Sequence, residues 1–142
     1  MGALGSGDYA EIFNDLQYNK AIGNYSHAEG KGTTAEKGCA HAEGEFASAT
    51  GWASHAEGYM TVASGLDSHA EGMYTHAVGE QAHAEGISTF ANGDGSHAEG
   101  RMTEADGLCS HAEGDKTHAQ GNYAHAEGGH MYYSGNRSNQ TF

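Results

Sequence analysis

The tetrapeptide His-Ala-Glu-Gly recurs eight times in this 142-residue chain, each copy beginning 14 residues after the one before it. The first copy begins at His27 and the last at His125. Halfway between successive copies lies a weaker one that keeps little more than Ala and Gly, as in Ser48-Ala-Thr-Gly51. The underlying unit is seven residues long, and such regularity predicts one elongated domain of stacked repeats.

The constant residues of the heptad exclude the usual helical repeats. Gly fills 16 of the 17 positions spaced by seven between Gly23 and Gly135, and Lys37 fills the other. A coiled coil needs large apolar residues at two heptad positions, and a Gly in every second helical turn would cost about 1 kcal/mol each. Collagen needs Gly at every third position. Neither structure is compatible with this chain.

The alternation inside each unit predicts β-structure. In a strand, Ser26, Ala28 and Gly30 would share one face while His27 and Glu29 share the other. Each heptad then forms one short strand and a turn, with the turns at Gly because it tolerates positive φ. The predicted fold is an all-β parallel β-solenoid with 14 residues per coil and about eight coils, roughly 40 Å long. Its interior holds Ser or Thr, Ala and Gly.

A solenoid this thin predicts self-association. Each coil encloses only small side chains and so buries little apolar area. The resulting hydrophobic stabilisation is small compared with the conformational entropy lost when 14 residues are ordered. The constant outer face should therefore pack against another chain. We expect a homotrimer of chains lying side by side.

The Ser-x-Ala-x-Gly heptads resemble the head repeats of YadA-type trimeric adhesins over about residues 20–135. The Ser-His-Ala-Glu-Gly form (Ser26 to Gly30, Ser54 to Gly58) resembles a variant common in bacteriophage tail and fibre proteins. The resemblance implies a left-handed parallel β-roll and a trimer. Where the adhesins have apolar residues flanking the alanine, this chain has His and Glu. We also expect a protein without the chaperone domain that often follows such repeats in phage proteins, the membrane anchor and the secretion signal.

Composition excludes several classes of function. The formal net charge of −13 opposes binding to nucleic acid or to anionic lipid. No run of 18 apolar residues exists, and residues 1–8 lack the basic and apolar regions of a signal peptide. The 23 glycines would suggest disorder if they were not periodic. We expect no membrane segment, no nucleic-acid partner and a virion or extracellular fibre assembled in the host cytoplasm.

The outward-facing His and Glu of the eight tetrapeptides predict a ladder with rungs roughly 4.8 Å apart. Its residues are His27, Glu29, His41, Glu43, His55, Glu57, His69, Glu71, His83, Glu85, His97, Glu99, His111, Glu113, His125 and Glu127. The favoured interpretation is an inter-subunit ladder in which His hydrogen-bonds to Glu of the neighbouring chain. Zinc or nickel binding is the alternative, weakened because no rung differs from the others. Catalysis lacks a nucleophile, so we expect no catalytic residue, no metal and no cofactor.

One turn of the solenoid carries an apolar row, here named the apolar corner. We expect neighbouring chains to bury it; the alternative is an aromatic strip that binds a glycan or receptor. Cys39 and Cys109 occupy one column of the other turn, five coils apart, which is too far for an intrachain disulfide. We expect free thiols. The apolar corner consists of Phe46, Tyr59, Met60, Met73, Tyr74, Ile87 and Met102.

The ends depart from the repeat and set the predicted domain boundaries: residues 1–19 a cap or trimerisation segment, 20–135 the β-roll and 136–142 a tail. Ile12, Phe13 and Leu16 would share one face of a short helix capped by Asp8. Such a helix would cover the open edge of the first coil.

The function expected from these observations is structural: a trimeric, non-catalytic segment of a phage tail fibre or related extracellular fibre, joined at its ends to other fibre or tail proteins. An adhesin head that binds a host-surface glycan or receptor is the alternative. An ice-binding solenoid is more remote, because the Thr column (Thr33, Thr61, Thr75, Thr89, Thr103, Thr117) points inward in the predicted register.

Overall fold

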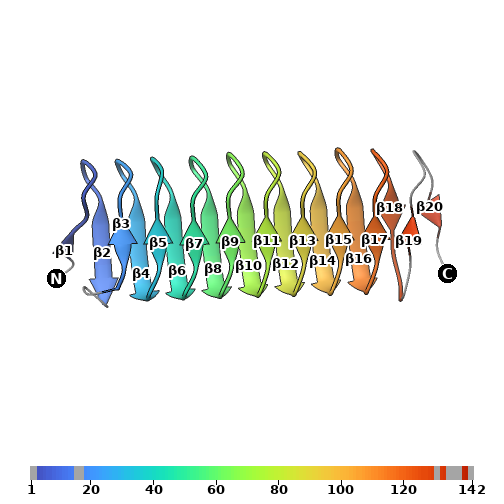
Figure 1. Ribbon diagram of the computed structural model, residues 1–142, viewed down its shortest axis with the longest axis horizontal. Coiled ribbons are helices and arrows are strands. Elements are labelled where there is room, and N and C mark those ends of the chain that lie inside the picture. Colours follow the sequence, from blue (N-terminus) through green and yellow to red (C-terminus); the bar gives the residue numbers. More distant parts are fainter. Residues whose placement is uncertain (1–2, 15–17, 130–131, 134–138, 141–142) are drawn as a thin grey trace.

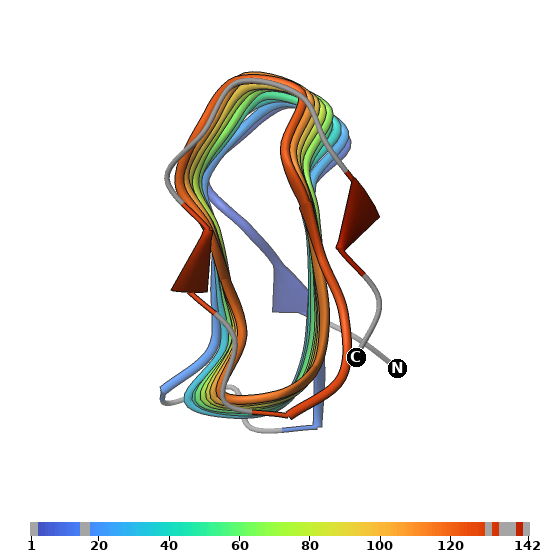
Figure 2. The ribbon, with the colours of Figure 1, turned by 90° about the vertical axis from the view of Figure 1, so that its right-hand side faces the viewer.

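The chain forms a straight β-solenoid in which successive coils stack along one axis (Figure 1). The computed structural model describes residues 3–14, 18–129, 132–133 and 139–140. Viewed along the rod, the coils superimpose as one flattened loop with two walls (Figure 2). The predicted all-β parallel solenoid of about eight 14-residue coils is confirmed. The left hand of the winding stays a prediction.

The two walls are two sheets of different strand length. One is an eleven-stranded sheet in the order β1-β2-β4-β6-β8-β10-β12-β14-β16-β18-β20, and the other a nine-stranded sheet in the order β19-β17-β15-β13-β11-β9-β7-β5-β3. We call them the long-strand sheet and the short-strand sheet.

The strands of the long-strand sheet that carry the tetrapeptide are β4 (His27–Lys31), β6 (His41–Glu45), β8 (His55–Tyr59), β10 (His69–Met73), β12 (His83–Ile87), β14 (His97–Arg101), β16 (His111–Asp115) and β18 (His125–Ala126). Those of the short-strand sheet are β3 (Lys20–Ala21), β5 (Thr34–Ala35), β7 (Ser48–Ala49), β9 (Val62–Ala63), β11 (His76–Ala77), β13 (Phe90–Ala91), β15 (Glu104–Ala105), β17 (His118–Ala119) and β19 (Tyr132–Tyr133). The remaining strands are β1 (Ala3–Leu4), β2 (Glu11–Asn14) and β20 (Asn139–Gln140).

The repeat translates directly into strand register. His69 pairs with His83 and Ala70 with Ala84, so each residue lies beside its equivalent in the next coil. This register holds to the end of the described chain, where β18 pairs with β20 and β17 with β19. In-register pairing turns every sequence column into a physical column along the rod.

The core is made of small side chains, as predicted. The Ala column from Ala21 to Ala126 is fully buried, and so are the Thr column and most of the Ser column. Ile12 is the only residue larger than Ala among the buried apolar residues that the structure describes. The inward position of Thr is confirmed, which removes the exposed Thr face that ice binding would need.

The two Gly columns differ, and one prediction about them is wrong. Gly65 and its equivalents from Gly51 to Gly121, which follow the short strands, are buried, but Gly72 of the tetrapeptide lies at the surface rather than in the interior. Its φ of 108° turns the backbone so that a Cβ would point along the rod, 2.2 Å from the carbonyl oxygen of Gly86. Both Gly columns exist because the next coil approaches too closely for any side chain.

The turns also differ from the prediction that Gly supplies their positive φ. At the tip of each turn stands a residue in the left-handed region, and most of these residues are not Gly: Tyr25, Cys39, Phe46, Ala53, Met60, Asp67, Tyr74, Gln81, Ser88, Met102, Cys109, Lys116 and Tyr123. The hydrogen bonds between stacked turns hold this conformation; Tyr74 N–H, for example, donates to Tyr59 O at 3.0 Å.

The predicted N-terminal helix is wrong. The segment forms β2, which pairs in parallel with β4, and β1 pairs antiparallel with β2 on its other side. Ile12 lies in the Ala column, beside Ala28, while Leu16 lies outside the described residues. A nine-residue helix is marginal alone, whereas a strand here hydrogen-bonds to the open edge of the first coil. The offset between β2 and β4 is 16 residues instead of 14, so a search for the 14-residue period does not detect this coil.

Candidate functional site

The ladder residues lie where the repeat predicts, on the outer face of the long-strand sheet. In the long strands from β4 to β16, His is the first and Glu the third residue, with Ala between them pointing inward. From His41 to His125 the imidazole rings stack with centroids 4.7–4.9 Å apart and planes within 6° of parallel. The predicted rung spacing is confirmed within a single chain.

Each interior His points its Nε2 atom between two carboxylates. His55 Nε2 lies 3.8 Å from Glu43 Oε1 and 3.9 Å from Glu57 Oε2. The same separation recurs along the rod, since His97 Nε2 lies 4.0 Å from Glu85 Oε1. These distances are too long for hydrogen bonds.

The ends of the ladder are tighter. His27 Nε2 lies 3.3 Å from Glu29 Oε2, and His125 Nε2 lies 3.1 Å from Glu113 Oε1. The hydrogen bond with His27 lowers the pKa of the Glu29 carboxyl. The change is gradual at the C-terminal end, since His111 Nε2 lies 3.4 Å from Glu99 Oε1.

The interior imidazoles are half-buried, and their Nε2 atoms are more occluded than the rings. The Nε2 atoms of His41, His55, His69, His83, His97 and His111 are buried without a hydrogen-bond partner. Burial, followed by repulsion from neighbouring imidazoles, lowers the pKa of His41, His55 and His83. Folding thus favours the neutral form of these residues, although carboxylates stand on either side.

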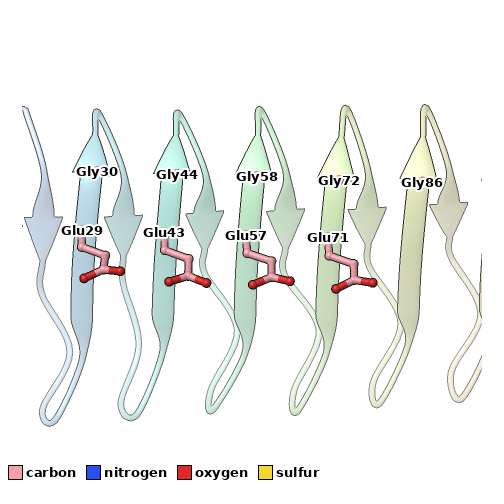
Figure 3. A pocket seen from close by; sticks show the side chains of 9 residues that line it. All are labelled: Glu29, Gly30, Glu43, Gly44, Glu57, Gly58, Glu71, Gly72 and Gly86. Carbon is pink, nitrogen blue, oxygen red and sulfur yellow. The ribbon is translucent and has the colours of Figure 1, made fainter.

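An open trough runs beside the carboxylates, because the Gly column has no side chains. It is lined by Glu29, Gly30, Glu43, Gly44, Glu57, Gly58, Glu71, Gly72 and Gly86, and the four glutamates repeat one conformation along it (Figure 3). The outer face of the long-strand sheet is therefore acidic and grooved in a straight line.

The apolar corner lies at the turn that follows the long strands. Phe46, Met60, Met73, Tyr74, Ile87 and Met102 are each between 38% and 52% exposed, and Tyr59 is half-buried. Tyr59 and Tyr74 make an edge-to-face contact with centroids 5.5 Å apart, and the Lys31 ammonium lies 5.5 Å from the centre of the Phe46 ring. The structure brings the predicted residues together as one exposed strip.

The opposite turn holds exposed aromatic residues that the sequence prediction did not include as a site. Trp52 is 60% exposed, Tyr25 62% and Tyr123 61%. Tyr25 stacks on Tyr9 with parallel rings 5.0 Å apart. Both cysteines, also in this turn, are free and exposed, as expected. Tyr25 and Tyr123 share one 14-residue column with Cys39 and Cys109, and Trp52 lies in the column directly before it; the 16-residue offset before β4 takes Tyr9 out of this spacing.

Comparison with known families now identifies the repeat. Residues 70–96 match the YadA head domain repeat in two copies. These coils are YadA-like head repeats. The match covers two of the 14-residue periods, and the same register and the same buried Ala column continue through the flanking coils. No curated protein matches the chain significantly. No helix long and apolar enough to span a membrane occurs among the described residues.

Proposed function

We propose that this YadA-like rod is a structural, non-catalytic segment of a trimeric fibre. The observation that carries the proposal is that the small apolar side chains are buried and the large ones are exposed, the reverse of an ordinary globular core. The buried apolar residues are almost all Ala, whereas large apolar side chains such as Trp52, Tyr74 and Ile87 stand at the surface. A core of methyl groups returns little free energy per residue, so neighbouring chains must bury the larger side chains.

The surfaces proposed to meet the neighbouring chains are the ladder and the apolar corner. Both border the long strands. The apolar residues of the corner follow one another from coil to coil without a polar residue from Tyr59 to Ile87, and Ser88 is the first polar residue after them. A straight row of identical rungs can face an identical row without loss of register, because both repeat at the same spacing. The short-strand sheet varies at its outward positions, as expected for a face in contact with water.

The fibre proposed is a phage tail fibre or a related extracellular fibre, with other fibre or tail proteins at the two ends. Supporting this, five of the eight tetrapeptides have the Ser-His-Ala-Glu-Gly form, and the rod presents β1 and β20 at opposite ends (Figure 1). A segment of this kind transmits force and sets length, and it needs neither a cofactor nor a catalytic group.

Sedimentation equilibrium of the full chain tests the assembly. We expect a species of three times the 14.8 kDa chain mass at micromolar concentration. Ile87→Lys, in the apolar corner, should shift it toward monomer, because burying an unpaired ammonium is costly. Val78→Lys, equally exposed on the short-strand sheet, is the matched control and should leave the mass unchanged. A folded monomer of the unaltered chain would overturn the proposal.

The second candidate is an adhesin head, favoured by the exposed aromatic side chains of the opposite turn. Trp52, Tyr25 and Tyr123 present flat rings of the kind that stack on sugars or insert into protein interfaces. Saturable binding of the isolated protein to cells or glycans, lost in Trp52→Ala with the trimer intact, would establish this role. Absence of saturable binding would leave the structural role.

A further inference from the structure

The interior of the ladder holds a repeated polar arrangement that the rod does not satisfy by itself. At His55, His69, His83 and His97 the Nε2 atom is buried and lacks a hydrogen-bond partner. A carboxylate oxygen stands 3.8–4.0 Å from each of these atoms. An occluded ring nitrogen without a partner is costly, and its recurrence on successive coils requires a physical reason.

We propose that the ladder binds divalent transition-metal ions of the zinc class, each held by one ladder His and by the carboxylates of two successive Glu residues. One such group is Glu43, His55 and Glu57, and others are Glu57 with His69 and Glu71, and Glu71 with His83 and Glu85. In each group the candidate ligand atoms all lie within 4.8 Å of one another.

The distances between His Nε2 and the Glu carboxylate oxygens fit two ligands of one metal ion better than a donor and acceptor of one hydrogen bond. Zn–N and Zn–O bonds are about 2.0–2.2 Å long, which places two ligand atoms about 3.4 Å apart in a tetrahedral site. The observed His–Glu separations of 3.8–4.0 Å exceed this by about half an ångström, and no two ligand atoms in a group are more than 4.8 Å apart. The open trough borders the glutamate side chains, so an ion and a water as its fourth ligand can approach the carboxylates from that side (Figure 3).

The donor set selects the class of ion. An imidazole nitrogen with two carboxylate oxygens suits zinc, nickel or copper, whereas calcium and magnesium prefer oxygen donors only. Each carboxylate is placed to bridge, since Glu85 offers Oε2 to His83 and Oε1 to His97. The sequence argument against a metal was that all rungs are alike. The structure answers it, because a site made from two successive coils recurs wherever the coils recur.

Charge sets the expected stoichiometry. The eight ladder glutamates carry eight negative charges, which about four divalent ions would neutralise. Ions on every rung would stand as close as the rings, 4.8 Å apart, and leave the ladder strongly positive. We therefore expect about four ions per chain, with binding that weakens once alternate rungs are filled.

The test uses the full chain, stripped with EDTA, dialysed against micromolar zinc chloride and analysed for bound metal. We expect about four zinc ions per chain and a rise in Tm. Cobalt(II) should give the intense visible absorption of tetrahedral coordination. The double variant His69→Gln/His83→Gln should lose one or two ions and part of the cobalt signal. The matched control is His76→Gln, on the short-strand sheet beside Val62 and Phe90, which should bind as the unaltered chain does.

Three outcomes would overturn the proposal: no zinc retained, zinc retained equally by the double variant, or magnesium bound as tightly as zinc. Each would mean that the carboxylates attract cations only by general charge, or not at all. The sites use ligands from one chain, so they do not depend on the trimer. Sedimentation of the EDTA-treated protein separates the two proposals. A trimer that forms without metal would support the fibre assembly whether or not the ladder binds zinc.

Discussion

The two walls of the rod are built from the same heptad, yet they obey different constraints. In both, Ala points inward at every coil and Gly permits the next coil to approach. Outside, the long-strand sheet repeats His and Glu without change from His27 to Glu127, whereas the short-strand sheet carries Val62, His76, Phe90 and Glu104 in one column. Inner columns are constrained by stacking within the chain. A constant outer column requires something further, which the proposals above identify as a neighbouring chain and bound metal.

The short-strand sheet shows what the outer face can tolerate. His76 stacks on Phe90, and His118 Nε2 lies 2.7 Å from Asp106 Oδ2, while Asp106 Oδ1 accepts a hydrogen bond from Asn92 Nδ2. These contacts are local and unlike one another. The β-roll therefore does not require His and Glu for folding, and their constancy on the other wall is informative.

The largest expected effect comes from the surface Gly column of the long-strand sheet. Gly72→Ala should lower the free energy of unfolding by about 3 kcal/mol or more, because it adds a left-handed non-Gly residue and a Cβ 2.2 Å from a backbone oxygen. Urea unfolding followed by circular dichroism measures it. Gly129→Ala is the control, since no atom of the described residues outside its chain neighbours lies within 4 Å of an added Cβ, and its effect should stay under about 0.5 kcal/mol. Equal effects would mean that the coils separate easily.

An intermediate effect is expected from pH in EDTA-containing buffer. Burial lowers the pKa of His41, His55 and His83 below the usual value of 6.5, so the unfolded chain binds protons that the folded chain does not. Stability should be complete above about pH 6.5 and should decline as the pH falls through that value. Melting temperatures between pH 8 and pH 5 measure it.

A variant pair assigns this pH dependence to one wall. His55→Gln/His83→Gln should flatten the profile, because neighbouring imidazoles add repulsion to burial in the ladder. His76→Gln removes a residue whose pKa is lowered by burial alone, so it should change the profile less. A profile that is flat in the unaltered protein would contradict the prediction.

The smallest expected effect compares the residues that lead into the two kinds of strand. Ser68 Oγ, before a long strand, donates to Gly65 O at 2.8 Å, whereas Thr75 Oγ1, before a short strand, is buried without a partner. Ser68→Ala should therefore destabilise by about 1 kcal/mol, and Thr75→Val should be neutral or stabilise by up to about 1 kcal/mol. Chemical unfolding at matched protein concentration measures both. Destabilisation by Thr75→Val would show that this hydroxyl has a partner in the assembled protein.

The sequence alone determined the features that depend on period. The 14-residue repeat and the alternation of inward and outward side chains were sufficient to predict the solenoid, the inward Ala and Thr columns and the outward ladder. In-register stacking makes this possible, because it places equivalent residues of successive coils side by side. The resemblance to YadA-type repeats came from the same residues. Where the period changed, at the 16-residue offset before β4, the prediction of a helix was wrong.

Tertiary structure decided what depends on contacts between coils. That Gly72 lies at the surface, that Tyr74 adopts positive φ and that His55 Nε2 stands unpartnered between Glu43 and Glu57 could not be read from a pattern of residue types. Each results from the distance and orientation at which one coil meets the next. A repeat specifies which residues become neighbours, but only their packing decides whether neighbouring groups form a hydrogen bond or leave a gap wide enough for an ion.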